Sequence, residues 1–351
     1  MDKRSFLKSF ALAVAGCAVA SPGALQAADI YKPAGPKLLK PRLLKAGDTI
    51  GLITPAGALT DEESIRQSRE VFEKLGFRIK EGKHIRARYG NLAGTDEERI
   101  ADIHAMFADK DVQGIVCIRG GNGASRLLDR LDYSLIARNP KVLLGYSDVT
   151  ALIMAFYAKA GLVSFHGAVG SSTWTKSLAA AFEEQFFANK LQHFRNPSDT
   201  SDNFIPYTNR IQTLTAGHVE GPLIGGNLTL LSGLCGSAYL PDFTGAILFL
   251  EEIDEGMERM DRMFCQLKNA GILSQIKGFV FGHCTDCSPA SGYGSLSMQD
   301  ILNDYIKPLG IPAFSGARIG HISNQFILPV GVRVRMDANQ GTMTLLENAL
   351  T

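Results

Sequence analysis

Segments with the apolar pattern of buried strands take turns with segments that have the pattern of helices, from residue 49 to residue 160. The strand-like segments are 49–55, 77–81, 112–118 and 142–145, and the helical segments are 60–75, 95–108, 124–131 and 149–160. Two helices are expected to begin at a capping box with the sequence Thr-Asp-Glu-Glu, at 60–63 and at 95–98. Such alternation favours a parallel sheet covered by helices on both faces, so we expect an α/β domain of the Rossmann or flavodoxin-like type.

The alternation ends in a polar stretch with two proline-containing turns, residues 182–210, which we interpret as a linker. The sequence therefore predicts an N-terminal α/β domain over 43–181 and a C-terminal domain over 211–351. The second domain is expected to be smaller, mixed α/β and rich in β-structure. Its predicted elements are strands at 246–250 and 276–281, a helix at 260–270 and two antiparallel strands at 332–337 and 342–347.

Residues 1–27 have the layout of a secretory signal peptide. Lys3, Arg4 and Lys8 precede a run of small and apolar residues from 9 to 20. This run is shorter than the roughly 20 residues that a transmembrane helix needs. The sequence therefore predicts export without a transmembrane anchor.

Two details of the signal concern the route and the product of export. Residues 3–8 resemble a twin-arginine motif with lysine in place of the first arginine. Cleavage after Ala27 would release a soluble periplasmic protein. Residues 14–17 resemble a lipobox, so a lipid anchor on Cys17 stays open as an alternative.

The net charge argues against a nucleic acid as partner. The whole chain has 36 basic and 35 acidic residues, and removal of residues 1–27 leaves one more acidic than basic residue. Domains that bind nucleic acids usually carry a clear excess of basic residues.

The cysteines after the signal are few and odd in number, which is not typical of a disulfide scaffold. Residues 283–287 (His-Cys-Thr-Asp-Cys) could be half of a metal site, but no second pair of ligands follows at a suitable spacing. A loop with a local disulfide between Cys284 and Cys287 is the favoured interpretation.

Ser147 lies where a predicted strand meets a predicted helix, with only Gly145 to Ser147 to make the corner. A serine on such a corner has an exposed hydroxyl next to free backbone N–H groups and the positive end of the helix dipole. The sequence is not Gly-x-Ser-x-Gly, and a serine that only caps the helix is the simpler alternative.

Three glycines, Gly120, Gly121 and Gly123, follow the predicted strand 112–118. They indicate that the backbone there closely approaches a ligand or another part of the chain. One interpretation is a phosphate-binding loop, although the Gly-x-Gly-x-x-Gly spacing is absent. The other is an oxyanion hole, in which the Gly121 N–H faces the Ser147 corner across neighbouring strand ends.

A nucleophilic serine needs a base and an acid that orients the base. His321 lies in a polar turn, and His166, which follows an apolar run, is a second candidate to line the site. Glu251 is the first acid after the apolar residues 247–250, whereas Glu252 is expected to be solvated.

Five motifs follow one another along the chain. They are Arg119-Gly120-Gly121, Gly145-Tyr146-Ser147-Asp148, Gly225-Gly226-Asn227-Leu228, Phe249-Leu250-Glu251, and Gly320-His321 with Leu328-Pro329-Val330-Gly331. In this order they resemble the LD-carboxypeptidase family, which also includes microcin-immunity peptidases. The resemblance covers residues 50 to 337.

The resemblance implies a serine peptidase with a Ser-His-Glu triad, no metal or other cofactor, and a homodimeric assembly. Matched motif by motif, it makes Ser147 the nucleophile, His321 the base and Glu251 the orienting acid. The N–H groups of Gly121 and Asp148 would form the oxyanion hole. Family members of the murein type release the terminal D-alanine of a tetrapeptide, so the expected role is in peptidoglycan turnover or recycling.

Four further residues are expected to bind substrate. Arg119 and the helix start at Asn227 are candidates for the terminal carboxylate of the peptide. Asn122 stands where the family usually has an aromatic residue, which changes the expected pocket, and Glu255 is also an alternative to Glu251. Two other functions stay open: an immunity-type peptidase that cleaves a peptidyl-nucleotide or an acidic peptide, and a periplasmic peptide-binding protein without catalysis.

Overall fold

The structure is a computed structural model that describes residues 36–198, 204–205, 210–288 and 294–351. The predicted signal peptide and Cys17 lie outside the described residues. None of the helices described is both long enough and apolar enough to span a lipid bilayer.

A six-stranded sheet carries the N-terminal part of the chain, in the order β12-β5-β4-β3-β1-β2. Its strands are β1 (Thr49–Ile53), β2 (Arg78–Glu81), β3 (Gly114–Cys117), β4 (Val142–Gly145), β5 (Phe165–His166) and β12 (Leu328–Pro329). The first five strands are parallel to their neighbours, and their order 2-1-3-4-5 is that of flavodoxin-like folds, which confirms the predicted fold type. Every residue of β1, β3 and β4 is buried, as expected for a sheet covered on both faces.

The helices of this part agree with the predicted alternation in most places. They are α2 (Glu63–Lys74), α3 (Asp96–Ala108), η1 (Ala124–Leu127), α4 (Tyr133–Arg138), η2 (Ser147–Val149), α5 (Thr150–Ala160) and α6 (Lys176–Phe186). The capping box at Thr95 and Glu98 is present. The one expected at 60–63 is wrong, because Asp61 Oδ1 accepts the N–H of Ser64 and the helix begins later. The helix expected at 124–131 is wrong, since only a short 3₁₀ turn, η1, forms there. A separate helix, α4, follows it and is capped by the side chain of Asp132.

An eight-stranded sheet carries the C-terminal part, in the order β6-β14-β13-β8-β9-β10-β11-β7. Its strands are β6 (His193–Phe194), β7 (Gln212–Thr215), β8 (His218–Asn227), β9 (Ile247–Ile253), β10 (Gly278–Thr285), β11 (Ala313–Ser315), β13 (Arg333–Asp337) and β14 (Thr342–Leu345). The strands β8 to β11 are parallel, while β13 and β14 form the predicted antiparallel pair. The helices beside this sheet are α7 (Leu228–Gly233), α8 (Met257–Asn269), α9 (Met298–Tyr305) and η3 (Lys307–Leu309).

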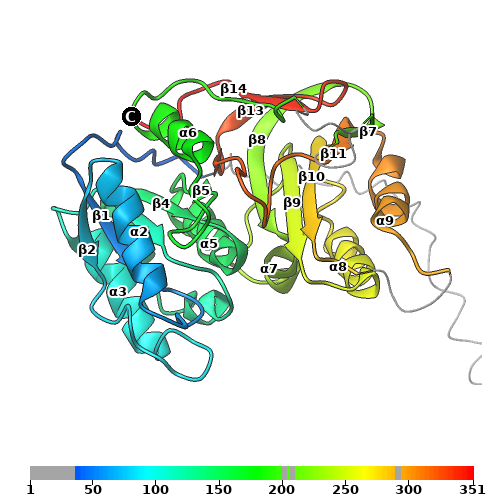
Figure 1. Ribbon diagram of the computed structural model, residues 1–351. Helices are drawn as coiled ribbons and strands as arrows, with labels where there is room; N and C mark the ends of the chain where they lie inside the picture. The colour runs from blue at the N-terminus through cyan, green and yellow to red at the C-terminus, as the bar shows by residue number, and fades with distance from the viewer. Residues whose placement is uncertain (1–35, 199–203, 206–209, 289–293) are drawn as a thin grey trace, which may run out of the picture. The chain divides into compact units, whose positions relative to one another are not determined.

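The two sheets are connected by more than the chain between them. Figure 1 shows α5 of the first part next to α7 and β8 of the second. Strand β12 comes from the C-terminal part of the chain and pairs antiparallel with β5 at the edge of the first sheet. Helix α6 and strand β6 occupy part of the segment predicted to be a linker, and the domain boundary itself stays a prediction.

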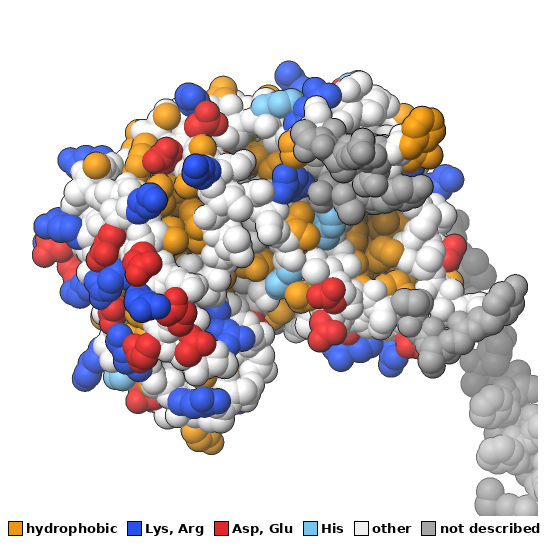
Figure 2. Space-filling view, viewed as in Figure 1, with side chains coloured by type: hydrophobic (Ala, Val, Ile, Leu, Met, Phe, Trp, Pro, Cys, Tyr) orange, Lys and Arg blue, Asp and Glu red, His pale blue; other side chains and the backbone are white. Residues whose placement is uncertain are grey.

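The charged side chains on the face seen in Figure 2 are of both signs. Over α2 and α3, lysine and arginine side chains lie beside aspartate and glutamate. Several of them form ion pairs, such as Arg69 with Glu81 and Arg86 with Glu62. Basic and acidic side chains are therefore interspersed over these two helices.

Candidate active site

Ser147 occupies a sharp corner between β4 and α5. The strand ends at Gly145, and the 3₁₀ turn that leads into α5 begins at Ser147 itself. The backbone φ of Ser147 is 62°, in the left-handed region that a side chain other than glycine's rarely adopts. The chain turns sharply at this serine, in the manner of the strained strand-to-helix turn that carries the nucleophile in α/β hydrolases.

The loop after β3 packs against this corner. A Cβ placed on Gly120 would lie 2.8 Å from Ser147 Cβ, so a side chain there would displace Ser147. One on Gly121, whose φ is 108°, would be strained and would lie 3.0 Å from Gly57 Cα. Among the described residues, neither the Gly121 N–H nor the Asp148 N–H donates a hydrogen bond to a protein acceptor. Both groups are therefore available to an oxyanion.

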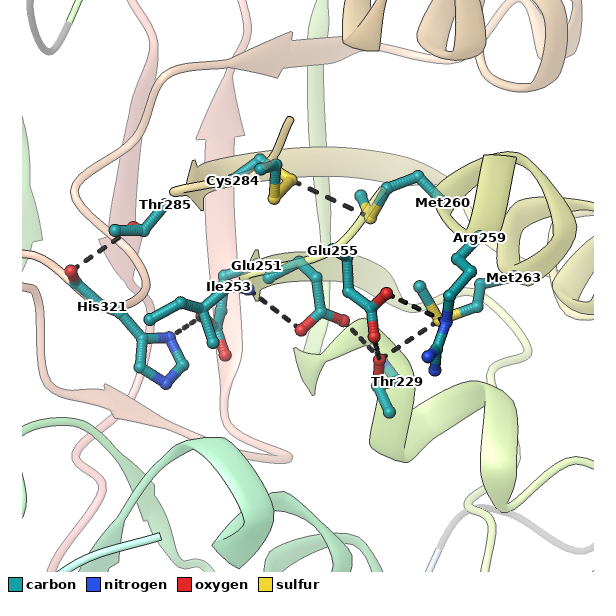
Figure 3. Close-up of a disulfide and its surroundings, with 12 residues drawn as sticks. Thr229, Glu251, Ile253, Glu255, Arg259, Met260, Met263, Cys284, Thr285 and His321 are labelled. Carbon is teal, nitrogen blue, oxygen red and sulfur yellow. Dashed lines mark hydrogen bonds and ion pairs between the residues drawn. A yellow bond between two sulfur atoms is a disulfide. The ribbon is translucent and has the colours of Figure 1, made fainter. Parts of the chain in front are cut away.

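His321 and Glu251 meet at the end of β9. His321 Nδ1 lies 2.8 Å from Glu251 Oε2, and the dashed line between the two side chains in Figure 3 marks this contact. Glu251 is fully buried, while 14% of the His321 side chain is exposed. A Cβ on Gly320, whose φ is 118°, would lie 3.0 Å from the same carboxylate oxygen, so a glycine is needed where the loop passes Glu251.

The loop that carries His321 is held by the end of β10. Thr285 Oγ1 donates a hydrogen bond to the His321 carbonyl oxygen (3.3 Å), and the His283 N–H donates to the Ile319 carbonyl oxygen (2.9 Å). Cys284 and Cys287 in the same segment form the predicted local disulfide (Figure 3). Residues 283–287, whose sequence is also compatible with half of a metal site, therefore hold the backbone of the His321 loop.

Tyr146 connects the serine corner to the histidine. Its ring lies 4.6 Å from the His321 ring, centroid to centroid, and burial raises the pKa of its hydroxyl. Tyr146 also lines a pocket of about 260 Å³ together with residues 171–173 and 321–325. Ser147 Oγ forms no hydrogen bond with His321 among the described residues. Such contacts often tighten only when substrate binds.

The other acids at the end of β9 and just beyond it have different partners. Glu255 Oε2 pairs with Arg259 Nε (2.9 Å) and does not contact His321, so Glu251 and not Glu255 is the acid beside His321. Glu252 was expected to be solvated, and this is wrong, since it is 2% exposed. Its carboxylate accepts hydrogen bonds from Asn227 Nδ2 (2.8 Å) and the Thr229 N–H (2.7 Å), and burial raises its pKa.

Three other residues predicted to bind substrate, Asn227, Arg119 and Asn122, form hydrogen bonds within the protein. Asn227 is buried, and its Oδ1 accepts the N–H of Leu230 to cap α7. Arg119 donates to the Ala58 carbonyl oxygen (2.9 Å). Asn122 Oδ1 accepts a hydrogen bond from the side chain of Asn91 (2.6 Å) at the surface.

Asp148 contributes its carboxylate as well as its N–H. Its Oδ2 accepts the N–H of Ala124 (2.7 Å), which ties the serine corner to the glycine loop. Burial raises the pKa of this carboxyl. This hydrogen bond connects Asp148 to the loop that carries Gly121, the other predicted oxyanion residue, and no local sequence pattern indicates it.

Comparison with known proteins places this geometry in a family. Residues 50–167 match the family model described as the LD-carboxypeptidase N-terminal domain, and residues 220–336 match the one described as the LD-carboxypeptidase C-terminal domain. The first matched segment contains the serine corner, and the second contains Glu251 and His321.

Individual relatives agree with these matches. A probable murein peptide carboxypeptidase of Bacillus subtilis (strain 168) is 35% identical over 306 residues, which is 87% of this chain and 94% of the relative. The murein tetrapeptide carboxypeptidase of Pseudomonas aeruginosa is 34% identical over 83% of this chain and 94% of its own length. A solved structure of MccF in complex with glutamyl sulfamoyl guanosine superposes with a TM-score of 0.79 at 27% identity, and the match covers 89% of this chain and all of that one. Since the two family models together match more than half of the sequence and both sheets of the fold, the chain belongs to the LD-carboxypeptidase family.

Proposed function

We propose that the protein is an exported serine carboxypeptidase that removes the terminal D-alanine from murein tetrapeptides. The observation that carries the proposal is the hydrogen-bonded pair of Glu251 and His321, whose imidazole packs on Tyr146, the residue just before Ser147. The names of the relatives from Bacillus subtilis and Pseudomonas aeruginosa support murein peptides as the substrate class.

In the proposed mechanism the three side chains divide the work as in other serine peptidases. Glu251 accepts the Nδ1–H of His321, so that Nε2 carries the lone pair and can act as a base. His321 Nε2 takes the proton of Ser147 Oγ while Oγ attacks the carbonyl carbon before the terminal residue. The Gly121 and Asp148 N–H groups donate to the oxyanion, and loss of one such donor typically lowers the rate on the order of a hundredfold.

The second half of the reaction restores the enzyme. The tetrahedral intermediate collapses, and His321 returns the proton to the nitrogen of the leaving D-alanine. Water then attacks the acyl-enzyme on Ser147, with His321 as base again, and releases the shortened peptide. The buried carboxylate of Glu251 stabilises the imidazolium that forms in both steps.

The test uses Ser147→Ala, with Ser274→Ala as the matched control. Ser274 is exposed, lies outside the pocket and donates only to the Gly271 carbonyl oxygen. Release of D-alanine from a murein tetrapeptide is expected to fall by at least about 10³-fold in Ser147→Ala and to be unchanged in the control. Both variants should melt like the parent protein. D-Alanine release at the parental rate by folded Ser147→Ala would overturn the nucleophile assignment.

Two further arms separate the alternatives. The structural similarity to MccF supports a trial of an acidic aminoacyl-nucleotide analogue beside the murein peptide, with the products identified by mass spectrometry. Cleavage of the nucleotide analogue alone would favour an immunity-type peptidase. A parent protein that binds the peptide but neither cleaves it nor reacts at Ser147 with a fluorophosphonate would be a binding protein.

Export is part of the same proposal. The signal-like residues 1–27 and the disulfide between Cys284 and Cys287 support an oxidising compartment such as the periplasm. Murein fragments in the periplasm, or the sacculus itself, would then be the accessible substrates. The homodimer expected from the resemblance stays a prediction.

A further inference from the structure

His166, on β5, lies fully buried between β4, which leads to Ser147, and β12. It pairs with Gly145, two residues before Ser147, on one side and with Leu328 of β12 on the other. No part of its side chain is exposed to solvent. The mechanism proposed above does not use this imidazole.

The His166 ring packs against both halves of the site. It lies 6.0 Å from the Tyr146 ring and 5.2 Å from the Phe249 ring, centroid to centroid. Phe249 and Glu251 are two apart on β9, so their side chains point to the same face of that strand. The imidazole of His166 is therefore next to the carboxylate that contacts His321.

Polar atoms without partners meet in this buried region. Both ring nitrogens of His166 lack a hydrogen-bond partner among the described residues, and so does Glu251 Oε1, the oxygen that does not contact His321. Buried polar atoms in proteins are nearly always hydrogen-bonded. A donor and an acceptor that are both unpaired in one buried region are natural partners for each other.

The charge state of His166 allows it to donate a hydrogen bond to the Glu251 carboxylate. Burial lowers the pKa of the imidazole to about 4, although the nearby Glu251 carboxylate raises it, and His321 lowers it further. The ring is therefore neutral at physiological pH, with one N–H donor and one acceptor nitrogen. A neutral donor can hold a carboxylate without neutralising its charge.

We propose that His166 is a positioning residue of the catalytic site: its N–H donates a hydrogen bond to Glu251 Oε1, directly or through one buried water molecule. This bond fixes the plane of the carboxylate, so that Oε2 stays directed at His321 Nδ1. The assignment rests on the proposed roles of Glu251 and His321. It adds to them a fourth side chain that acts through Glu251 and does not touch the substrate.

The experiment compares two side chains of similar size, His166→Gln, which keeps a donor, and His166→Met, which has none. The readout is the rate at which Ser147 reacts with a fluorophosphonate, which needs no knowledge of the natural substrate. His166→Met is expected to react about 10- to 100-fold more slowly than the parent protein, as is usual when a residue that orients a catalytic ligand is lost. His166→Gln is expected to react about tenfold or more faster than His166→Met, because it still has an N–H donor.

A double-mutant cycle separates positioning from packing. In a Glu251→Gln background, His166→Met should change the rate by less than about twofold, because residues that act through one another are not additive. Thermal melting of each variant is measured in parallel. If His166→Met does not fold, the pair His166→Leu and His166→Asn replaces it, with the same expectations.

Three outcomes would overturn the proposal. The first is a folded His166→Met that reacts at the parental rate. The second is an equal loss of labelling rate in His166→Gln and His166→Met. The third is that His166→Met lowers the labelling rate as much in the Glu251→Gln background as in the parent protein. Both of these outcomes indicate a role in packing alone. If the parent protein itself does not react at Ser147, the proposed function fails and this inference fails with it.

Discussion

The left-handed backbone of Ser147 is the residue-scale feature on which the site depends. A side chain in this region costs about 1 kcal/mol or more, and such strain is kept where the surrounding structure enforces it. The enforcing contacts are the short turn after Gly145 and the hydrogen bond from the Ala124 N–H to Asp148. The strained conformation is consistent with a serine that does more than cap a helix.

Replacement of Gly120 by alanine should block this serine without unfolding the protein. The new Cβ would lie 2.8 Å from Ser147 Cβ and 3.0 Å from Oγ, so the nucleophile must shift. A displacement of this kind is expected to lower kcat by about 10²-fold, since catalysis is sensitive to misplacement by about 1 Å. The measurement is D-alanine release or fluorophosphonate labelling, together with a melting curve.

Gly233→Ala is the matched control for that variant. Gly233 is exposed in α7, has an ordinary φ, and a Cβ there would meet no atom within 4 Å. The control should keep parental activity. Parental labelling of Gly120→Ala would show that the glycine loop does not restrict Ser147.

The residues of the site could be predicted only where local sequence carries the signal. The corner at Ser147 follows from a strand and a helix with three residues between them. Local sequence leaves both His321 and His166 as candidates, and only the ordered motifs favour His321. The motifs also favour Glu251, while the contact that separates it from Glu255 joins residues 70 positions apart. Glu252 was assigned to solvent because its partners come from the start of α7, about 25 residues away in sequence.

At the scale of elements, the end of β10 holds the loop that carries His321. The segment that contains the disulfide also provides Thr285, whose hydroxyl donates to the His321 carbonyl oxygen. The register between β9 and β10 is irregular between Phe281 and Cys284, so regular strand pairing is interrupted just where the support is needed. The disulfide to Cys287 begins at Cys284, where this irregular stretch ends.

The double variant Cys284→Ser, Cys287→Ser is expected to be less stable and less active. Opening a ring of four residues lowers the free energy of unfolding by about 2 kcal/mol in the chain-entropy model. Activity should fall too, because the anchor of His321 lies in the same segment. Thermal melting and D-alanine release measure the two effects, with Cys265→Ser, which removes a free thiol, as control. Equal melting of double variant and parent would contradict this role.

Elements were predictable where the periodic pattern is long and missed where it is short or rich in glycine. The strands β1, β3 and β4 and the helix α3 agree with the sequence pattern within a few residues. The strand β8 was not predicted, because Gly221, Gly225 and Gly226 weaken the strand signal. The structure needs Gly225 there, since a Cβ would lie 1.8 Å from the Phe249 carbonyl oxygen.

At the scale of the whole molecule, export can be tested directly on the full chain. In a host with a periplasm, the protein is expected in the periplasmic fraction with an intact mass that begins at Ala28. Arg4→Lys should abolish export by the twin-arginine route, whereas Lys3→Arg should preserve it. A lipid-modified protein that begins at Cys17, or a parent protein that stays in the cytoplasm with its signal intact, would contradict the expectation.

The edge strand β12 sets the order in which the first sheet can be completed. It is made by Leu328 and Pro329, far along the chain from β5, yet it closes the edge of the sheet that leads to Ser147 and lies beside His166. While the ribosome is still adding these residues, the sheet has an open edge and His166 has a neighbour on one side only. The first sheet therefore cannot complete this edge until residues 328 and 329 have been synthesised, long after the segment that forms the Ser147 corner.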